Sequence, residues 1–94
     1  MIKEERLKIV SKSWDLHDKI ETSYLDDPAK RGDNEWLEKQ RLLLSDMAIH
    51  LLITSISPDK IKLDRLRDNL HAILTITDQF LHDAEFKKAT EKLY

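Results

Sequence analysis

The feature that most constrains this chain is a segment, residues 36–56, with apolar side chains in nearly every direction around a helix. At about 100° per residue, only a narrow strip through Lys39, Asp46 and His50 stays polar along its length. A helix that is apolar on almost every side must be buried on almost every side. We therefore expect a central helix that is N-capped by Asp33 or Asn34 and ends near Ile56. Its apolar residues are Trp36, Leu37, Leu42, Leu43, Leu44, Met47, Ala48, Ile49, Leu51, Leu52, Ile53 and Ile56.

Residues 2–25 show the pattern of an amphipathic helix that packs on one side only. The apolar positions cover about half of the helix circumference, and the other half carries mixed charges. The segment that follows, residues 26–33, holds the only glycine and one of the two prolines. It therefore predicts the connection between the first two helices. The apolar set is Ile2, Leu7, Ile9, Val10, Trp14, Leu16, Ile20 and Tyr24.

A third helix is predicted to begin at Ser57 and Pro58, because serine is a good N-cap and proline is well tolerated as the first helical residue. Ile56 and Ile61 have the spacing of a hydrophobic staple. The apolar stripe of this helix is narrow, so one neighbouring surface would cover it. The stripe consists of Leu63, Leu66, Leu70, Ile73, Leu74, Thr77, Phe80 and Leu81.

The C-terminal residues break the phase of the third helix. Phe86, Ala89 and Leu93 lie about two residues, or half a turn, out of phase with the preceding stripe. Asp83 can serve as an N-cap, so we expect a short fourth helix over residues 84–93. The alternative is one long helix that ends at Tyr94.

These patterns together predict an all-α fold, a small antiparallel bundle of three main helices plus a short C-terminal helix. With 94 residues, the chain is expected to form a single helical-bundle domain over residues 1–94. The absence of cysteine excludes disulfides, zinc–thiolate sites and thiol nucleophiles. Neither a signal peptide nor a membrane span of about 20 apolar residues is apparent. We therefore expect a cytoplasmic protein without a membrane role.

Three of the histidines have a carboxylate at the spacing that metal ligands use on a helix. Asp46 with His50, Asp78 with His82, and His17 with Glu21 are pairs four residues apart on one helix face. Such pairs chelate metals in some proteins but are also ordinary surface hydrogen-bond partners, and none matches the Glu-x-x-His pairing of di-metal bundles. The sequence alone therefore predicts neither a metal site nor a cofactor.

The sequence also contains no recognisable catalytic motif. Ser45 and His50 do not share a helix face, and a single glycine cannot form a loop that cradles phosphates. We therefore expect no enzyme and assign no catalytic residues.

Nucleic-acid binding is the alternative function that the basic residues suggest. Lys60, Lys62, Arg65 and Arg67 cluster at the start of the predicted third helix, after a junction that loosely resembles a helix-turn-helix. The formal net charge is −2, and Asp59, Asp64 and Asp68 would lie against phosphate groups. We therefore rank this reading below protein binding.

The main functional hypothesis rests on the two apolar faces of the central helix. Its face of Leu37, Leu44, Met47 and Leu51 can serve as intramolecular core, while the opposite face is left for the C-terminal helix or another chain. We expect a non-catalytic protein–protein interaction module that forms a homodimer or binds another protein. The predicted partner-binding residues are Leu42, Ile49, Ile53, Ile56, Phe86, Leu93 and Tyr94.

A closed monomer is the competing hypothesis, in which the C-terminal helix folds back over the central helix. By analogy of size and charge alone, small bacterial or phage regulators, inhibitors and immunity proteins are the class we expect.

Overall fold

The computed structural model describes residues 1–83 of the chain, which form three α-helices. They are α1 (Lys3–Asp26), α2 (Trp36–Ile56) and α3 (Leu63–Asp83), and residues 1–83 contain no β-strand. The all-α prediction is therefore confirmed, and all three main helices are present. The predicted short C-terminal helix, with Phe86, Leu93 and Tyr94, falls outside the described residues.

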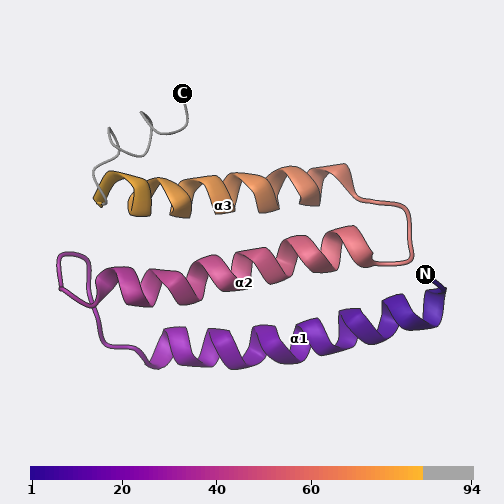
Figure 1. Cartoon of the computed structure of the whole chain (residues 1–94), viewed down its shortest axis with the longest axis horizontal. Coiled ribbons are helices and arrows are strands. Elements are labelled where there is room, and N and C mark those ends of the chain that lie inside the picture. Colours follow the sequence, from indigo (N-terminus) through magenta and orange to yellow (C-terminus); the bar gives the residue numbers. More distant parts are fainter. Residues whose placement is uncertain (84–94) are drawn as a thin grey trace.

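The three helices lie side by side in chain order, antiparallel, with α2 in the middle (Figure 1). Helix α2 packs against both neighbours, whereas no Cα atom of α1 lies within 8 Å of a Cα atom of α3. The described part of the chain is therefore a single layer. Only Gln40, Asp46 and Ile53 are buried on α2, so the expectation that this helix is buried on almost every side was wrong. Each neighbour covers one side of α2, which leaves the two surfaces of the layer open.

Helices α1 and α2 are joined along one polar seam. The Lys39 ammonium donates to the backbone carbonyls of Asp27 and Ala29, at 2.8 and 3.3 Å, and lies 4.8 Å from the centre of the Tyr24 ring. Further along the seam, Asp46 contacts His17 of α1. Positions 39, 42, 46, 49 and 53 follow the alternating three- and four-residue spacing of one helix face. That face of α2 therefore turns toward α1.

Helix α3 packs on the opposite side of α2. The Thr54 hydroxyl donates to the Asn69 side-chain oxygen at 2.6 Å, and Ile76, at 5% exposure, is the buried apolar residue of α3. The predicted stripe of this helix was right in part, since Leu66, Ile73, Thr77, Phe80 and Leu81 are half-buried. It omitted the buried Ile76 and included Leu63, Leu70 and Leu74, which are 71%, 45% and 67% exposed. One neighbour covers part of the apolar circumference of α3 and leaves the rest in solvent.

The predicted start of the third helix was also wrong. The Ser57 hydroxyl and the Ser57 backbone N–H both donate to the Ile53 carbonyl, at 2.6 and 3.1 Å. Ser57 therefore satisfies the last turn of α2 and does not cap α3. Ile61 is 43% exposed, and the helix begins only at Leu63.

The connection between α1 and α2 is held by local hydrogen bonds. The Asp27 carboxylate accepts from the Ala29 N–H at 2.9 Å, and the Asp33 carboxylate accepts from the Lys30 N–H at 2.8 Å. Gly32 has a φ of 99°, a backbone conformation that glycine adopts far more easily than other residues. Because Asp33 is used in this turn, it does not cap α2, which starts at Trp36.

Candidate functional site

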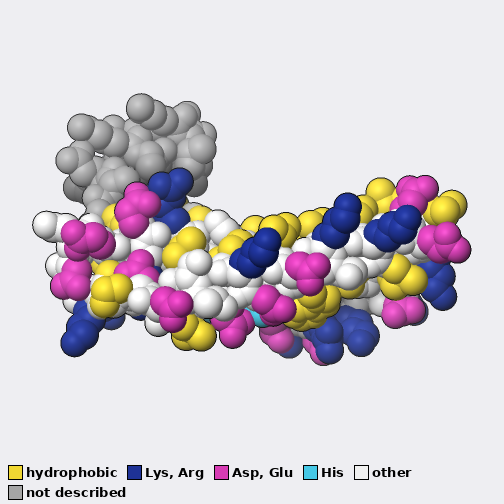
Figure 2. All heavy atoms as spheres, turned by 90° about the horizontal axis from the view of Figure 1, so that it is seen from below, with side chains coloured by type: hydrophobic (Ala, Val, Ile, Leu, Met, Phe, Trp, Pro, Cys, Tyr) yellow, Lys and Arg dark blue, Asp and Glu magenta, His cyan; other side chains and the backbone are white. Residues whose placement is uncertain are grey.

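Exposed leucines run along one face of α3. Leu63, Leu70 and Leu74 of α3 are 71%, 45% and 67% exposed, and Leu52 of α2 is 42% exposed. The three residues of α3 share one helix face by their spacing of seven and four residues. We call these three residues the leucine face. Figure 2 shows the layer from the α1 side, where hydrophobic, acidic and basic side chains intersperse.

Helical geometry turns the leucine face away from α2. Ile76 is buried, and Asn69, which bonds to Thr54 of α2, lies seven residues before it on the same side of α3. At about 100° per residue, Leu63, Leu70 and Leu74 lie about 120–160° from Ile76. The leucine face therefore points away from α2, at the outer edge of the layer.

The chain exposes more surface than a closed domain of its size. Its accessible surface is 7505 Å², whereas a compact monomer of 11.1 kDa exposes about 5,700 Å². Only Ala29, Ile53 and Ile76 are buried apolar residues within the described range. A single layer of helices therefore leaves much of its apolar surface in water.

A second candidate site lies between α1 and α2, halfway along both helices. The His17 imidazole uses both nitrogens, with Nδ1 2.5 Å from Asp46 Oδ1 and Nε2 2.8 Å from Glu21 Oε2. His50, one turn after Asp46, places its Nε2 3.6 Å from Asp46 Oδ2. We call His17, Glu21, Asp46 and His50 the histidine–carboxylate cluster. The Asp46 and His17 side chains are 8% and 13% exposed, and that of His50 is 28% exposed.

The carboxylates around His17 favour its charged form. The hydrogen bond to Asp46 raises the pKa of His17 above its usual 6.5, and the negative charges of Asp46, Glu21 and Asp18 raise it further. Partial burial acts in the opposite direction but is outweighed. The two carboxylates therefore favour a protonated His17 over a wider pH range than a free histidine.

Trp14 borders this cluster on α1. Its ring lies edge-on to the imidazoles of His17 and His50, with centroids 5.3 and 5.8 Å away, and the two imidazoles are 4.8 Å apart. Trp14 is 42% exposed, so it is not the core residue that its spacing suggested.

The cluster has the chemistry of a cation site more than that of a hydrolase. One ligand atom from each of His17, Asp46 and His50 lies within 4.8 Å of the other two. The Ser13 hydroxyl, one turn before His17, donates to the Ile9 carbonyl at 2.7 Å, so it is not held against the imidazole as a nucleophile. Two imidazoles and a carboxylate are a common donor set for transition metals.

The predicted partner-binding residues of α2 lie on the side that faces α1. Ile53 is 8% exposed, and Leu42, Ile49 and Ile56 are half-buried. This face of α2 is therefore less exposed to solvent than the leucines of α3.

Three of the four basic residues considered for nucleic-acid binding come together. Lys60, Lys62 and Arg65 line a pocket of about 220 Å³ with Trp14 and Thr54. Arg67 does not line this pocket; it lies beside Asp68, with Nε 3.7 Å from the carboxylate.

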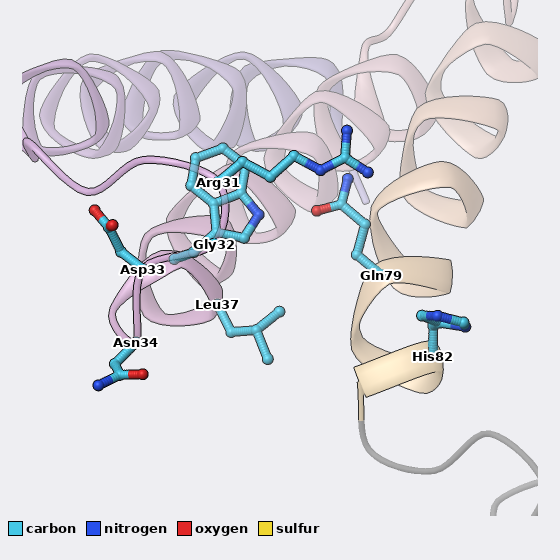
Figure 3. Close-up of a pocket in the computed structure, with 8 residues that line it drawn as sticks. Arg31, Gly32, Asp33, Asn34, Leu37, Gln79 and His82 are labelled. Atoms are coloured by element: carbon cyan, nitrogen blue, oxygen red, sulfur yellow. The ribbon is translucent and has the colours of Figure 1, made fainter.

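A further groove of about 390 Å³ lies between the first connection and the end of α3. Arg31 and Gln79 point toward each other across it, while Asp33 and Asn34 point away (Figure 3). Its polar groups do not converge on one point, so we assign it no chemistry.

The histidine–carboxylate cluster was not foreseen from the sequence, although both of its pairs were noted. His17 lies 15 residues before Gly32 and Asp46 lies 14 residues after it. In an antiparallel helix pair, residues equidistant from the connection face each other. The nearly equal distances from Gly32 therefore indicate, from the sequence alone, that the His17–Glu21 pair and the Asp46–His50 pair lie next to each other.

Comparisons of the chain with protein-family models, curated proteins and solved structures find no match. Among residues 1–83, no helix is long and apolar enough to cross a membrane. Function therefore has to be argued from the leucine face and the histidine–carboxylate cluster.

Proposed function

We propose that the protein is a non-catalytic interaction module that pairs with a second copy of itself through the leucine face. The observation that carries this proposal is the exposure of Leu63, Leu70 and Leu74 along one face of α3. Contiguous apolar patches on a protein surface mark interaction sites when they exceed a few hundred Å².

The extended layer leaves surface for a second copy to cover. A standard interface buries about 800 Å² on each partner, and the chain exposes roughly 1,800 Å² more than a compact monomer of its mass. Two copies packed through the leucine face would bring their α3 helices together on the dimer axis. At about 25 cal/mol per Å², a few hundred Å² of buried apolar surface contributes several kcal/mol, comparable with the stability of a domain this small.

The C-terminal residues Phe86, Leu93 and Tyr94 stay in the proposal as further contributors to the interface. The competing arrangement places them on the same chain, where they would close a four-helix monomer. A module of either kind fits the small regulators, inhibitors and immunity proteins that act by covering a partner's surface.

The test is the solution mass of the protein over a range of concentrations, measured by sedimentation or light scattering. We expect a dimer for the unchanged chain and a monomer for Leu74→Glu, which places a charge in the interface. Thr75→Glu is the matched control, because Thr75 is exposed on α3 and outside the leucine face. If the unchanged chain stays monomeric at every concentration, the homodimer proposal is refuted.

Deletion of the residues after Asp83 separates the two arrangements. A closed four-helix monomer would lose its fourth helix, and its newly exposed core would cause aggregation or new oligomers. A homodimer held mainly by the leucine face would remain a dimer.

Nucleic-acid binding remains the second candidate, because Lys60, Lys62 and Arg65 share one pocket with Trp14. Binding of this kind would depend on phosphate contacts and would weaken steeply with salt. Fluorescence anisotropy with labelled DNA and RNA tests it, and Lys62→Glu should abolish any binding that the pocket provides.

A further inference from the structure

We propose that His17, Asp46 and His50 form a binding site for a divalent transition-metal ion, with Zn²⁺ as the ion that fits the donor set. The three side chains come from two helices, and each offers a ligand atom within 4.8 Å of the other two. Two imidazole nitrogens and one carboxylate oxygen suit Zn²⁺, Co²⁺, Ni²⁺ and Cu²⁺, whereas Mg²⁺ and Ca²⁺ prefer oxygen ligands alone.

The separations require two adjustments. Two ligands of a tetrahedral zinc ion lie about 3.3 Å apart when the metal–ligand bonds are about 2.0–2.1 Å. His50 Nε2 and Asp46 Oδ2 are 3.6 Å apart, close to this value. His17 Nδ1 and Asp46 Oδ1 are 2.5 Å apart, so they must separate by about 0.8 Å. The ligand atoms of His17 and His50 lie within 4.8 Å of each other, so this pair must close by up to about 1.5 Å. Side-chain rotations of Asp46 and the two histidines would supply both movements.

Glu21 prepares His17 for this role. Its Oε2 lies 2.8 Å from His17 Nε2, an ion-pair contact that favours a proton on that nitrogen and leaves Nδ1 toward Asp46. Metal-bound histidines commonly donate their second N–H to a carboxylate, which fixes the ring and strengthens the ligand. The ion would replace the proton that His17 and Asp46 share, and this proton would leave to solvent.

The position of the cluster allows an ion to enter. The His50 side chain is 28% exposed and leaves room for a water molecule as the fourth ligand, whereas Asp46 is nearly buried. Trp14 touches both imidazoles edge-on and would report the occupied site through its fluorescence.

The test is calorimetric titration of the full-length, tag-free protein with ZnCl₂, together with cobalt absorption spectra. We expect one ion per chain, a rise in the melting temperature, and the visible absorption bands of tetrahedral Co²⁺. In a Trp36→Phe background, Cu²⁺ should quench the remaining Trp14 fluorescence.

His50→Gln is the sharpest variant, because it removes one ligand and leaves the contacts of His17 with Asp46 and Glu21 in place. We expect it to weaken zinc binding by more than about 100-fold, beyond the 10- to 100-fold that loss of an outer partner costs. Glu21→Gln should weaken zinc binding by about 10- to 100-fold. His71→Gln is the matched control, since His71 is exposed on α3, and it should bind as the unchanged protein does.

Three results would overturn the proposal. They are the absence of zinc binding at millimolar concentration, binding that His50→Gln leaves unchanged, and a stoichiometry of one ion per two chains. The last result would place the ion between protein copies and not inside the α1–α2 pair. Each variant's circular dichroism shows whether it is folded, so that a loss of binding is not mistaken for unfolding.

Discussion

Gly32 illustrates how a single residue sets the first connection of the chain. Its φ of 99° lies in the region that other residues rarely adopt, and an added Cβ would meet no atom within 4 Å. Any cost of substitution therefore comes from the backbone and not from a clash. We expect Gly32→Ala to lower the free energy of unfolding by about 1–2 kcal/mol. Gly32→Asn should cost less, because asparagine tolerates positive φ, and urea denaturation measures both; equal losses would show that the backbone is not the cause.

Gln40 is the most deeply buried side chain that carries a polar group without a partner. It is 2% exposed, and its Nε2 has no hydrogen-bond partner in the described structure. An unsatisfied buried donor costs about 1–3 kcal/mol. We expect Gln40→Met, which keeps the length of the side chain, to raise the free energy of unfolding by about 1 kcal/mol. A lower stability for this variant, measured by urea denaturation, would mean that the amide has a partner after all.

At the scale of elements, the existence of all three helices could be predicted from apolar periodicity, but two of their starts could not. Ser57 reads as an N-cap in sequence, and only the structure shows its hydroxyl on the Ile53 carbonyl. Asp33 likewise reads as a cap but bonds to Lys30 within the turn. Serine and aspartate side chains can bond to backbone groups at helix starts, at helix ends and in turns. The residue type alone therefore does not show which of these a given residue stabilises.

The contact between α1 and α2 makes stability depend on pH. The pKa of His17 is raised in the folded chain by Asp46, and also by Glu21 and Asp18. The stabilisation is therefore fully present below the unfolded pKa of about 6.5 and is lost as pH rises through the higher folded value. In the presence of a chelator, we expect the free energy of unfolding to fall over that range.

Two histidine variants check this dependence on pH. His17→Gln should remove the loss of stability above about pH 6.5, because its side chain does not titrate. His71→Gln should retain that loss, since His71 is exposed on α3. Urea denaturation across the pH series measures the slope, and an unchanged slope in His17→Gln would contradict the assignment to His17.

At the scale of the whole molecule, the sequence predicted an open apolar surface on the central helix, whereas the structure exposes leucines along α3. Leu42, Ile49 and Ile53 follow the face that turns to α1, while Leu63, Leu70 and Leu74 of α3 remain exposed. Periodicity shows how wide an apolar stripe is, but not which neighbour covers it. The histidine–carboxylate cluster escaped prediction for the same reason, since it depends on the register between two helices.

If the leucine face holds two copies together, folding and association are coupled, and the melting temperature depends on protein concentration. Each tenfold increase in concentration stabilises a dimer by about 1.4 kcal/mol. For two chains of this length, that corresponds to a rise of roughly 3 °C in melting temperature. We expect this rise for the unchanged chain and for Thr75→Glu, measured by circular dichroism from micromolar to millimolar concentration. Leu74→Glu should melt at a lower temperature that does not change with concentration, because a single chain unfolds independently of its neighbours.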